Sequence, residues 1–145
     1  HLQPKEIVKI PESSWGKGGH HEVWMNEGVQ YMWESLYAME KEADDLVAAA
    51  MMSKKGSVLR RVVTQALREL MLAQASDWEF LVSTFSAADY AQMRFHHHRD
   101  DFMRLAKSAR LLMQGSKFSK KERDYLYACE QRNAVFPELD VSRWS

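Results

Sequence analysis

The sequence predicts an all-α fold: a four-helix bundle-like domain preceded by an extended N-terminal arm and a loop rich in glycine and tryptophan. Apolar residues recur at three- and four-residue steps after about residue 26, which is the spacing of one helix face. Before that point, prolines and glycines interrupt any regular period. We therefore expect residues 1–26 to form the arm and loop, and residues 27–145 to form the helical part of a single domain.

The first two helices are predicted from long apolar stripes. The first helix ends near the Ser53–Gly56 break, and the second covers about residues 59–74. The second has the clearest stripe, and its face must be buried. Four charged residues fall on the side opposite this stripe: Arg60, Arg61, Arg68 and Glu69.

The next predicted helix is the longest. The apolar piece Trp78–Val82 follows the second helix without a strong breaker, so that helix is either kinked or restarted with Ser76 or Asp77 as its cap. Ser86 then resembles a cap for a helix that runs to about Gly115. The buried seam of this helix is predicted to consist of Ala91, Phe95, His98, Phe102, Leu105, Ala109 and Leu112.

The last helix is predicted from its capping box. Ser119 is followed three residues later by Glu122, a pattern that opens a helix, and this helix extends to about Arg132. The tail Asn133–Ser145 contains Pro137 and is predicted to be coil.

Length and charge restrict the class of protein. A chain of 145 residues with 46% hydrophobic content can bury the core of one domain. Twenty basic and twenty acidic residues cancel, so no overall field attracts nucleic acid or an anionic membrane. One cysteine excludes an intramolecular disulfide, and no apolar run approaches the roughly 20 residues that span a bilayer. We expect a cytoplasmic protein and, since the sequence begins at His1, a fragment.

The sequence contains no convincing catalytic or metal-binding pattern. The consecutive histidines His96–His98 point about 100° apart on a helix and cannot close around one ion. We expect His98 on the buried seam, its two neighbours in solvent, and Cys129 as a small buried hydrophobe. The carboxylate pairs Asp44–Asp45 and Asp100–Asp101 are expected on solvated polar faces. We assign no catalytic residue, metal or cofactor to this chain.

The segment Ser13–Trp24 is the remaining candidate site. It places Trp15 and Trp24 around three glycines and two histidines, outside any amphipathic pattern. An indole face can cover the C–H patch of a pyranose ring while nearby polar groups bind the hydroxyls. A neutral glucan suits a chain of zero net charge. On the residues alone, a ligand platform and a plug that fixes the loop to the bundle remain open.

Four blocks of sequence carry a further resemblance. They are Ile10–Asn26 with Ser-Trp-Gly-Lys-Gly-Gly and Trp33; Leu67–Phe80 with Gln-Ala-Ser-Asp-Trp-Glu-Phe; Tyr90, Arg94, His98, Phe102 and Leu105; and Asn133–Asp140. In this order they resemble the family 57 glycoside hydrolases, in particular the α-1,4-glucan branching enzymes. The blocks cover nearly the whole chain.

The resemblance implies that another domain carries the catalytic residues. The family has an N-terminal (β/α)₇ barrel followed by a helical C-terminal domain, and this chain corresponds to the second part. A glutamate nucleophile and an aspartate acid/base about 5–5.5 Å apart perform the retaining reaction. Both belong to the barrel, which is absent from this chain, so the chain alone should be inactive.

The implied task of this domain is to hold α-1,4-glucan. The matching groove residues are Trp15 and Trp24, while Asp77 could accept hydroxyl hydrogens and Trp78 is equally suited to packing. Aromatic cover excludes water, which favours glycosyl transfer over hydrolysis.

Two alternatives remain: the same domain of a 4-α-glucanotransferase or α-amylase, and a non-catalytic helical module that binds protein. The family pattern is not followed at Lys17, at His20–His21 and at Val141–Trp144, which leaves the subfamily and the preferred glucan chain length undecided. The sequence does not determine the oligomeric state either.

Overall fold

The structure is a computed structural model that describes residues 8–144, and within this range it contains helices and no strand. The all-α prediction is therefore confirmed. Ile7 and the rest of the arm before it, and Ser145, lie outside the described residues. The helices are α1 (Gln30–Met52), α2 (Val58–Ala73), α3 (Asp77–Ser83), α4 (Ala88–Met113) and α5 (Lys120–Arg132), with short 3-10 helices η1 (Lys17–Gly19) and η2 (Val141–Arg143).

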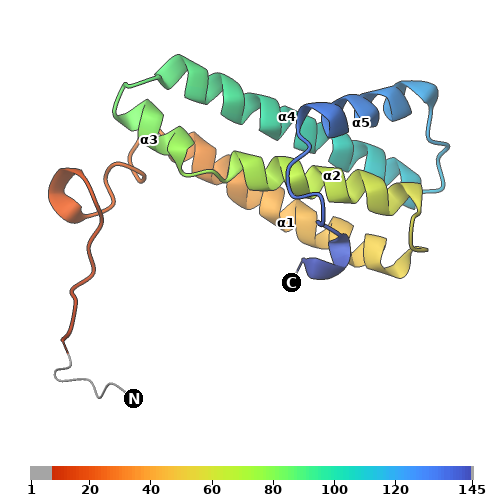
Figure 1. The fold of residues 1–145 in the computed structure, drawn as a ribbon, viewed down its shortest axis with the longest axis horizontal. Coiled ribbons are helices and arrows are strands. Elements are labelled where there is room, and N and C mark those ends of the chain that lie inside the picture. Colours follow the sequence, from red (N-terminus) through yellow and green to blue (C-terminus); the bar gives the residue numbers. More distant parts are fainter. Residues whose placement is uncertain (1–7, 145) are drawn as a thin grey trace.

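The long helices α1, α2 and α4 pack side by side and form the body of the domain (Figure 1). The short helix α3 packs against α4, and α5 contacts α2 and α4. The irregular segment before α1 lies at the α3 end of the bundle, and α5 lies toward the opposite end (Figure 1). Because α2 ends at Ala73 and α3 begins at Asp77, the chain restarts a helix here and does not continue through a kink.

The predicted apolar stripes form the core. In α2, the side chains of Val62, Val63, Ala66, Leu67 and Leu70 are fully buried. Burial of each larger side chain contributes about 1.5–3 kcal/mol, so this helix supplies much of the stabilising area. The α4 seam is confirmed as well, from Ala91 to Ala109. None of the helices within residues 8–144 is both long enough and apolar enough to cross a membrane.

One predicted serine cap is confirmed, and another is wrong. The capping box of α5 is present: Ser119 Oγ accepts from the Glu122 amide, and the Glu122 carboxylate accepts from the Ser119 amide. The predicted cap at Ser86 is wrong. Ala87 occupies the N-cap position of α4 without a side-chain bond, because Ser86 Oγ lies 2.9 Å from Thr84 Oγ1 instead.

The prediction that Arg60 lies on a solvated face of α2 is wrong. Its side chain is buried, and its guanidinium donates to the carbonyls of Ala50, Met51 and Ser53 at the end of α1. A cation at a helix C-terminus satisfies the free carbonyls and complements the helix dipole. The residue therefore joins two helices rather than facing solvent.

Glu69 and Asp101 correct the prediction further, since both carboxyl groups are buried. The Glu69 carboxyl accepts from Gln65 Nε2 at 2.8 Å and from Asn133 Nδ2 at 2.9 Å, and lies 2.8 Å from His98 Nδ1. These partners come from α2, from the tail after α5, and from α4. One carboxyl group thus ties three segments together.

The neighbouring carboxyl of Asp101 accepts from the Tyr125 hydroxyl and from Arg132 at 2.6 Å. It lies with Glu69 and Cys129 in a buried group whose donor atoms are within 4.8 Å of one another. Burial, and then Asp101 and Glu69, raise the pKa of the Cys129 thiol to about 11. Because a metal needs the thiolate and both carboxyls already have partners, these residues do not suit a cation site.

The three histidines separate as their helical spacing requires. His98 is buried beside Glu69, and His97 is exposed. His96 differs from the prediction because it is half-buried, with its ring 5.9 Å from that of Tyr31.

Replacement of Glu69 by alanine is expected to lower the free energy of unfolding by about 3–5 kcal/mol, since several buried donors lose their acceptor. The matched control is Asp100→Ala, which breaks the exposed pair with Arg99 and should cost less than about 1 kcal/mol. Urea denaturation followed by circular dichroism measures both. Equal losses in the two variants would contradict the structural role of Glu69.

The Cys129 thiol is expected to resist thiol reagents at about pH 8, because its raised pKa keeps it protonated and burial blocks access. A raised pKa of an acid stabilises the fold below the unfolded value of about 8.5, and this contribution is lost as the pH rises toward the folded value. Labelling with a colorimetric disulfide, in native buffer and in urea, measures the effect. Rapid labelling of the folded chain at about pH 8 would be the opposite result.

Candidate functional site

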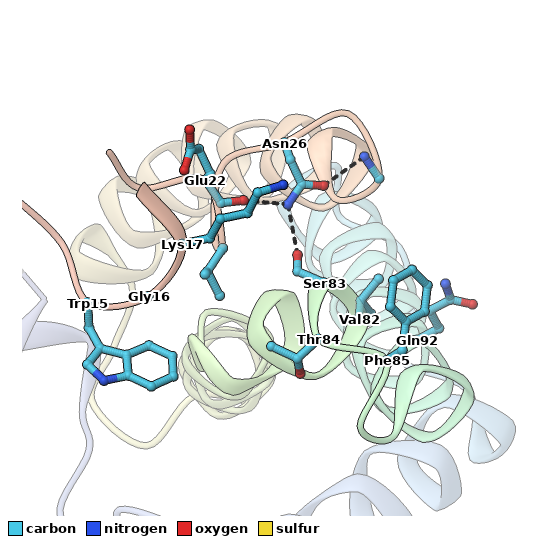
Figure 2. A pocket seen from close by; sticks show the side chains of 12 residues that line it. Trp15, Gly16, Lys17, Glu22, Asn26, Val82, Ser83, Thr84, Phe85 and Gln92 are labelled. Atoms are coloured by element: carbon cyan, nitrogen blue, oxygen red, sulfur yellow. Dashed lines mark hydrogen bonds between the residues drawn. The ribbon is translucent and has the colours of Figure 1, made fainter. Parts of the chain in front are cut away.

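A groove of about 780 Å³ lies between the aromatic loop, residues 14–28, and the turn that joins α3 to α4. We call it the Trp15 groove. Trp15 and Lys17 line it from the loop, and Ser83, Phe85 and Gln92 line it from the helical side. Figure 2 shows Trp15 and Phe85 toward opposite ends of the groove, with Lys17 and Ser83 between them in this view.

Glycine shapes the turn that carries Trp15. Gly16 has a φ of +93°, and a Cβ at this position would lie 2.6 Å from Val23 Cγ2. Since an L side chain would be both strained and blocked, only glycine fits. The Ser14 amide donates to the Gly19 carbonyl at 3.0 Å, and the His21 amide donates to Ser14 Oγ at 2.7 Å. The loop therefore has a defined, hydrogen-bonded shape.

Trp24 joins the aromatic loop to two helical segments. Its indole N–H donates to the Ser76 carbonyl at 3.0 Å, just before α3. Its own carbonyl accepts from the indole N–H of Trp33 in α1 at 2.7 Å. Trp24 is half-buried, so it both supports the loop and presents part of its ring.

The structure brings Trp15 and Trp24 together with Phe80. The ring of Trp15 lies 6.3 Å from that of Trp24 and 5.6 Å from that of Phe80, between ring centroids. Trp15 remains 69% exposed, so one side of its indole is available to a ligand. Such tilted and edge-on contacts stabilise the ring arrangement by about 0.5–1.5 kcal/mol per pair.

The other two predicted site residues lie elsewhere. Asp77 is exposed at the first position of α3 and is not among the residues that line the Trp15 groove. Trp78 is half-buried, donates its indole N–H to the Leu72 carbonyl at 2.8 Å, and stacks on His98 with 6.5 Å between centroids. Neither residue therefore lines the groove, although Asp77 directly follows Ser76, whose carbonyl accepts from the Trp24 indole N–H.

Several groove residues escaped the sequence analysis. No role in the site is predicted from the sequence for Asn26, Ser83 or Phe85, which all line the groove. Asn26 Nδ2 donates to Ser83 Oγ and to the Glu22 carbonyl, both at 2.8 Å, which closes one side of the groove. The backbone spacing of Asn26 and Ser83, 57 residues apart, leaves no local pattern that could indicate this contact.

The polar groups of the groove can bind hydroxyls. Within residues 8–144, the side chains of Lys17, Glu22 and Gln92 form no hydrogen bond with the protein. Glu22 supplies the carboxyl among the groove-lining residues, whereas retaining glycosyl transfer uses two carboxyls on either side of the bond that breaks. The groove has the composition of a binding surface: an aromatic wall and dispersed polar groups.

Comparisons with known proteins bear on the whole helical region. Residues 35–144 match the family described as "1,4-alpha-glucan branching enzyme, C-terminal". The 1,4-alpha-glucan branching enzyme of Thermococcus kodakarensis is 38% identical over 104 residues, which are 70% of this chain and 15% of that protein. A probable 1,4-alpha-glucan branching enzyme of Mycobacterium tuberculosis is 38% identical over 99 residues, 63% of this chain and 18% of that protein.

Two solved structures have the same fold. The GH57-type branching enzyme of Pyrococcus horikoshii superposes with a TM-score of 0.77 and 32% identity, over 97% of this chain and 26% of that chain. A GH57 branching enzyme of Thermococcus kodakaraensis, in complex with glucose and additives, superposes with a TM-score of 0.78 and 33% sequence identity, over 97% of this chain and 25% of that chain. The chain thus spans at most about a quarter of these relatives. It belongs to the family of C-terminal domains of GH57-type 1,4-α-glucan branching enzymes.

Proposed function

We propose that this domain forms one wall of the substrate groove of a 1,4-α-glucan branching enzyme, which transfers a segment of α-1,4-glucan to create α-1,6 branches in a glycogen-like glucan. The observation that carries this proposal is the exposed indole of Trp15 at the groove, supported from behind by Trp24 and Phe80. The names of the relatives favour branching over the 4-α-glucanotransferase and α-amylase alternatives.

The groove suits an uncharged sugar chain. The apolar face of a pyranose can stack on Trp15, and burial of that face gains about 25 cal/mol per Å². Lys17, Glu22 and Gln92 then offer donors and acceptors to the hydroxyls at the ring edge. The lining contains one basic residue, Lys17, and one acidic residue, Glu22, so it carries no excess charge that would favour an ionic ligand.

The reacting carboxyls are proposed to come from an N-terminal (β/α)₇ barrel of a larger protein. The length of the relatives, of which this chain spans 15% to 26%, supports this arrangement. The domain would then hold the glucan in place for transfer and exclude water from the cleft, which favours a sugar hydroxyl as acceptor over hydrolysis. We further propose that the enzyme works in the cytoplasm, without a nucleic-acid or membrane partner.

Trp15→Ala, introduced into the full-length protein that contains this domain, is expected to lower the branching rate about tenfold, since an aromatic contact of about 1.4 kcal/mol corresponds to that factor. Trp15→Phe should retain most of the rate because it keeps a flat apolar face. The rate is measured as α-1,6 linkages formed from amylose by proton NMR.

The matched control is Tyr127→Ala, an exposed aromatic residue on α5 that is remote from the groove. It should leave the rate unchanged. Unimpaired branching by Trp15→Ala would refute the proposed role of the groove. Release of reducing ends without α-1,6 linkages in the unsubstituted protein would indicate an amylase, and longer linear chains a 4-α-glucanotransferase.

A further inference from the structure

A second, smaller hollow of about 320 Å³ adjoins the aromatic loop at the start of α1. Met25, Asn26, Gln30, Trp33 and Tyr37 line it, and we call it the Tyr37 hollow. Asn26 lines the Trp15 groove as well, so the two depressions meet at this residue. None of the predicted site residues lines the Tyr37 hollow.

An aromatic pair forms its wall. Trp33 and Tyr37 are four residues apart on α1, which places them on one face of the helix. Their ring centroids are 6.1 Å apart with 35° between the planes. Tyr37 is 60% exposed, and Trp33 is held in place by the hydrogen bond from its indole N–H to the Trp24 carbonyl. The pair is therefore an oriented aromatic surface that the core covers only in part.

The polar groups around the pair suit a neutral ligand with many hydroxyls. The five lining residues carry no formal charge at neutral pH. Gln30 Nε2 donates to Glu34 Oε1 at 2.8 Å, which orients both side chains. Gln30 Oε1 and Glu34 Oε2 accept no hydrogen bond from residues 8–144 and can accept hydroxyl hydrogens. The hollow beside Arg60, by contrast, is lined by Lys55, Arg61, Arg68 and Arg143 together with three acidic residues.

We propose that the Tyr37 hollow is a second α-1,4-glucan subsite, which receives the part of a chain that extends beyond the Trp15 groove past Asn26. This inference rests on the proposed function. A short oligosaccharide fills the Trp15 groove alone, whereas a longer chain contacts both aromatic surfaces. The Tyr37 hollow thus gives the domain a preference for longer glucan chains.

Tyr37 is the residue that tests the subsite with least disturbance. Its ring is mostly exposed, and its hydroxyl forms no hydrogen bond with residues 8–144. Trp33 is unsuitable because its indole N–H supports Trp24, so its loss would disturb the Trp15 groove too.

The experiment uses the full-length protein and its Tyr37→Ala, Tyr37→Phe and Gln30→Ala variants, with Tyr127→Ala as an exposed aromatic control. Isothermal titration measures the dissociation constants for maltotriose and for long amylose chains, and thermal unfolding checks the fold. Tyr37→Ala is expected to weaken binding of the long chains about threefold to tenfold and to leave maltotriose unchanged. Gln30→Ala should act in the same direction, and Tyr37→Phe should bind as the parent does.

The outcomes separate this inference from the proposed function. If Trp15→Ala weakens both ligands while Tyr37→Ala and Gln30→Ala leave long-chain binding unchanged, the second subsite is refuted and the Trp15 groove stands. If neither position affects either ligand, the proposed function itself fails. If Tyr37→Ala leaves glucan binding intact but lowers the melting temperature of the full-length protein, the hollow is a contact with another domain, and the inference is overturned.

Discussion

The candidate site depends on the two hydrogen bonds of Trp24. Its carbonyl accepts from Trp33 in α1, and its indole N–H donates to the Ser76 carbonyl before α3. The aromatic loop has little regular structure of its own, so these bonds, together with the bond from Asn26 to Ser83, hold it against the bundle. Trp15 then rests against Trp24 and Phe80, and the groove opens beside them. The sequence left two roles open for the tryptophans, a ligand platform and a plug that fixes the loop to the bundle. The two roles are compatible, because Trp24 anchors the loop while Trp15 stays exposed.

The anchor at Ser76 is supported in turn by the buried polar network. Trp78, two residues further on, stacks on His98 and donates to the Leu72 carbonyl, which fixes the turn between α2 and α3. His98 lies against the Glu69 carboxyl, which also accepts from Asn133. Buried polar groups with hydrogen-bond partners favour one packing arrangement, since a slip of a helix would leave these donors and acceptors unpaired. A series of contacts therefore links the Glu69 carboxyl in the core to the turn that binds Trp24.

The sequence allowed the helices to be predicted more fully than the site. Apolar periodicity located the buried faces of α1, α2 and α4, and the capping box located the start of α5, because both patterns are local. The burial of Glu69 was missed because its partner Asn133 is 64 residues away, so nothing near Glu69 in the sequence distinguishes it from a solvated residue. The contact between Asn26 and Ser83 was missed for the same reason. The composition of the segment Ser13–Trp24 singled out Trp15 and Trp24, and the family resemblance implied their role in a groove, whereas their contacts with Phe80 and Ser76 required the fold.

Three exposed aromatic residues lie at the two depressions beside the aromatic loop. Trp15, Tyr37 and Phe85 are 69%, 60% and 86% exposed, so they add little to the hydrophobic stabilisation of the bundle. Phe85 also has a φ of +55°, a backbone conformation that is unfavourable for a bulky side chain. All three line depressions next to the aromatic loop. Elsewhere, partly buried charges pair across helices, as Glu130 does with Arg61 and Arg110 with Glu42. The three rings therefore remain available to the glucan proposed for the Trp15 groove and the Tyr37 hollow, whereas Tyr127 and Phe136, which are also exposed, line neither depression.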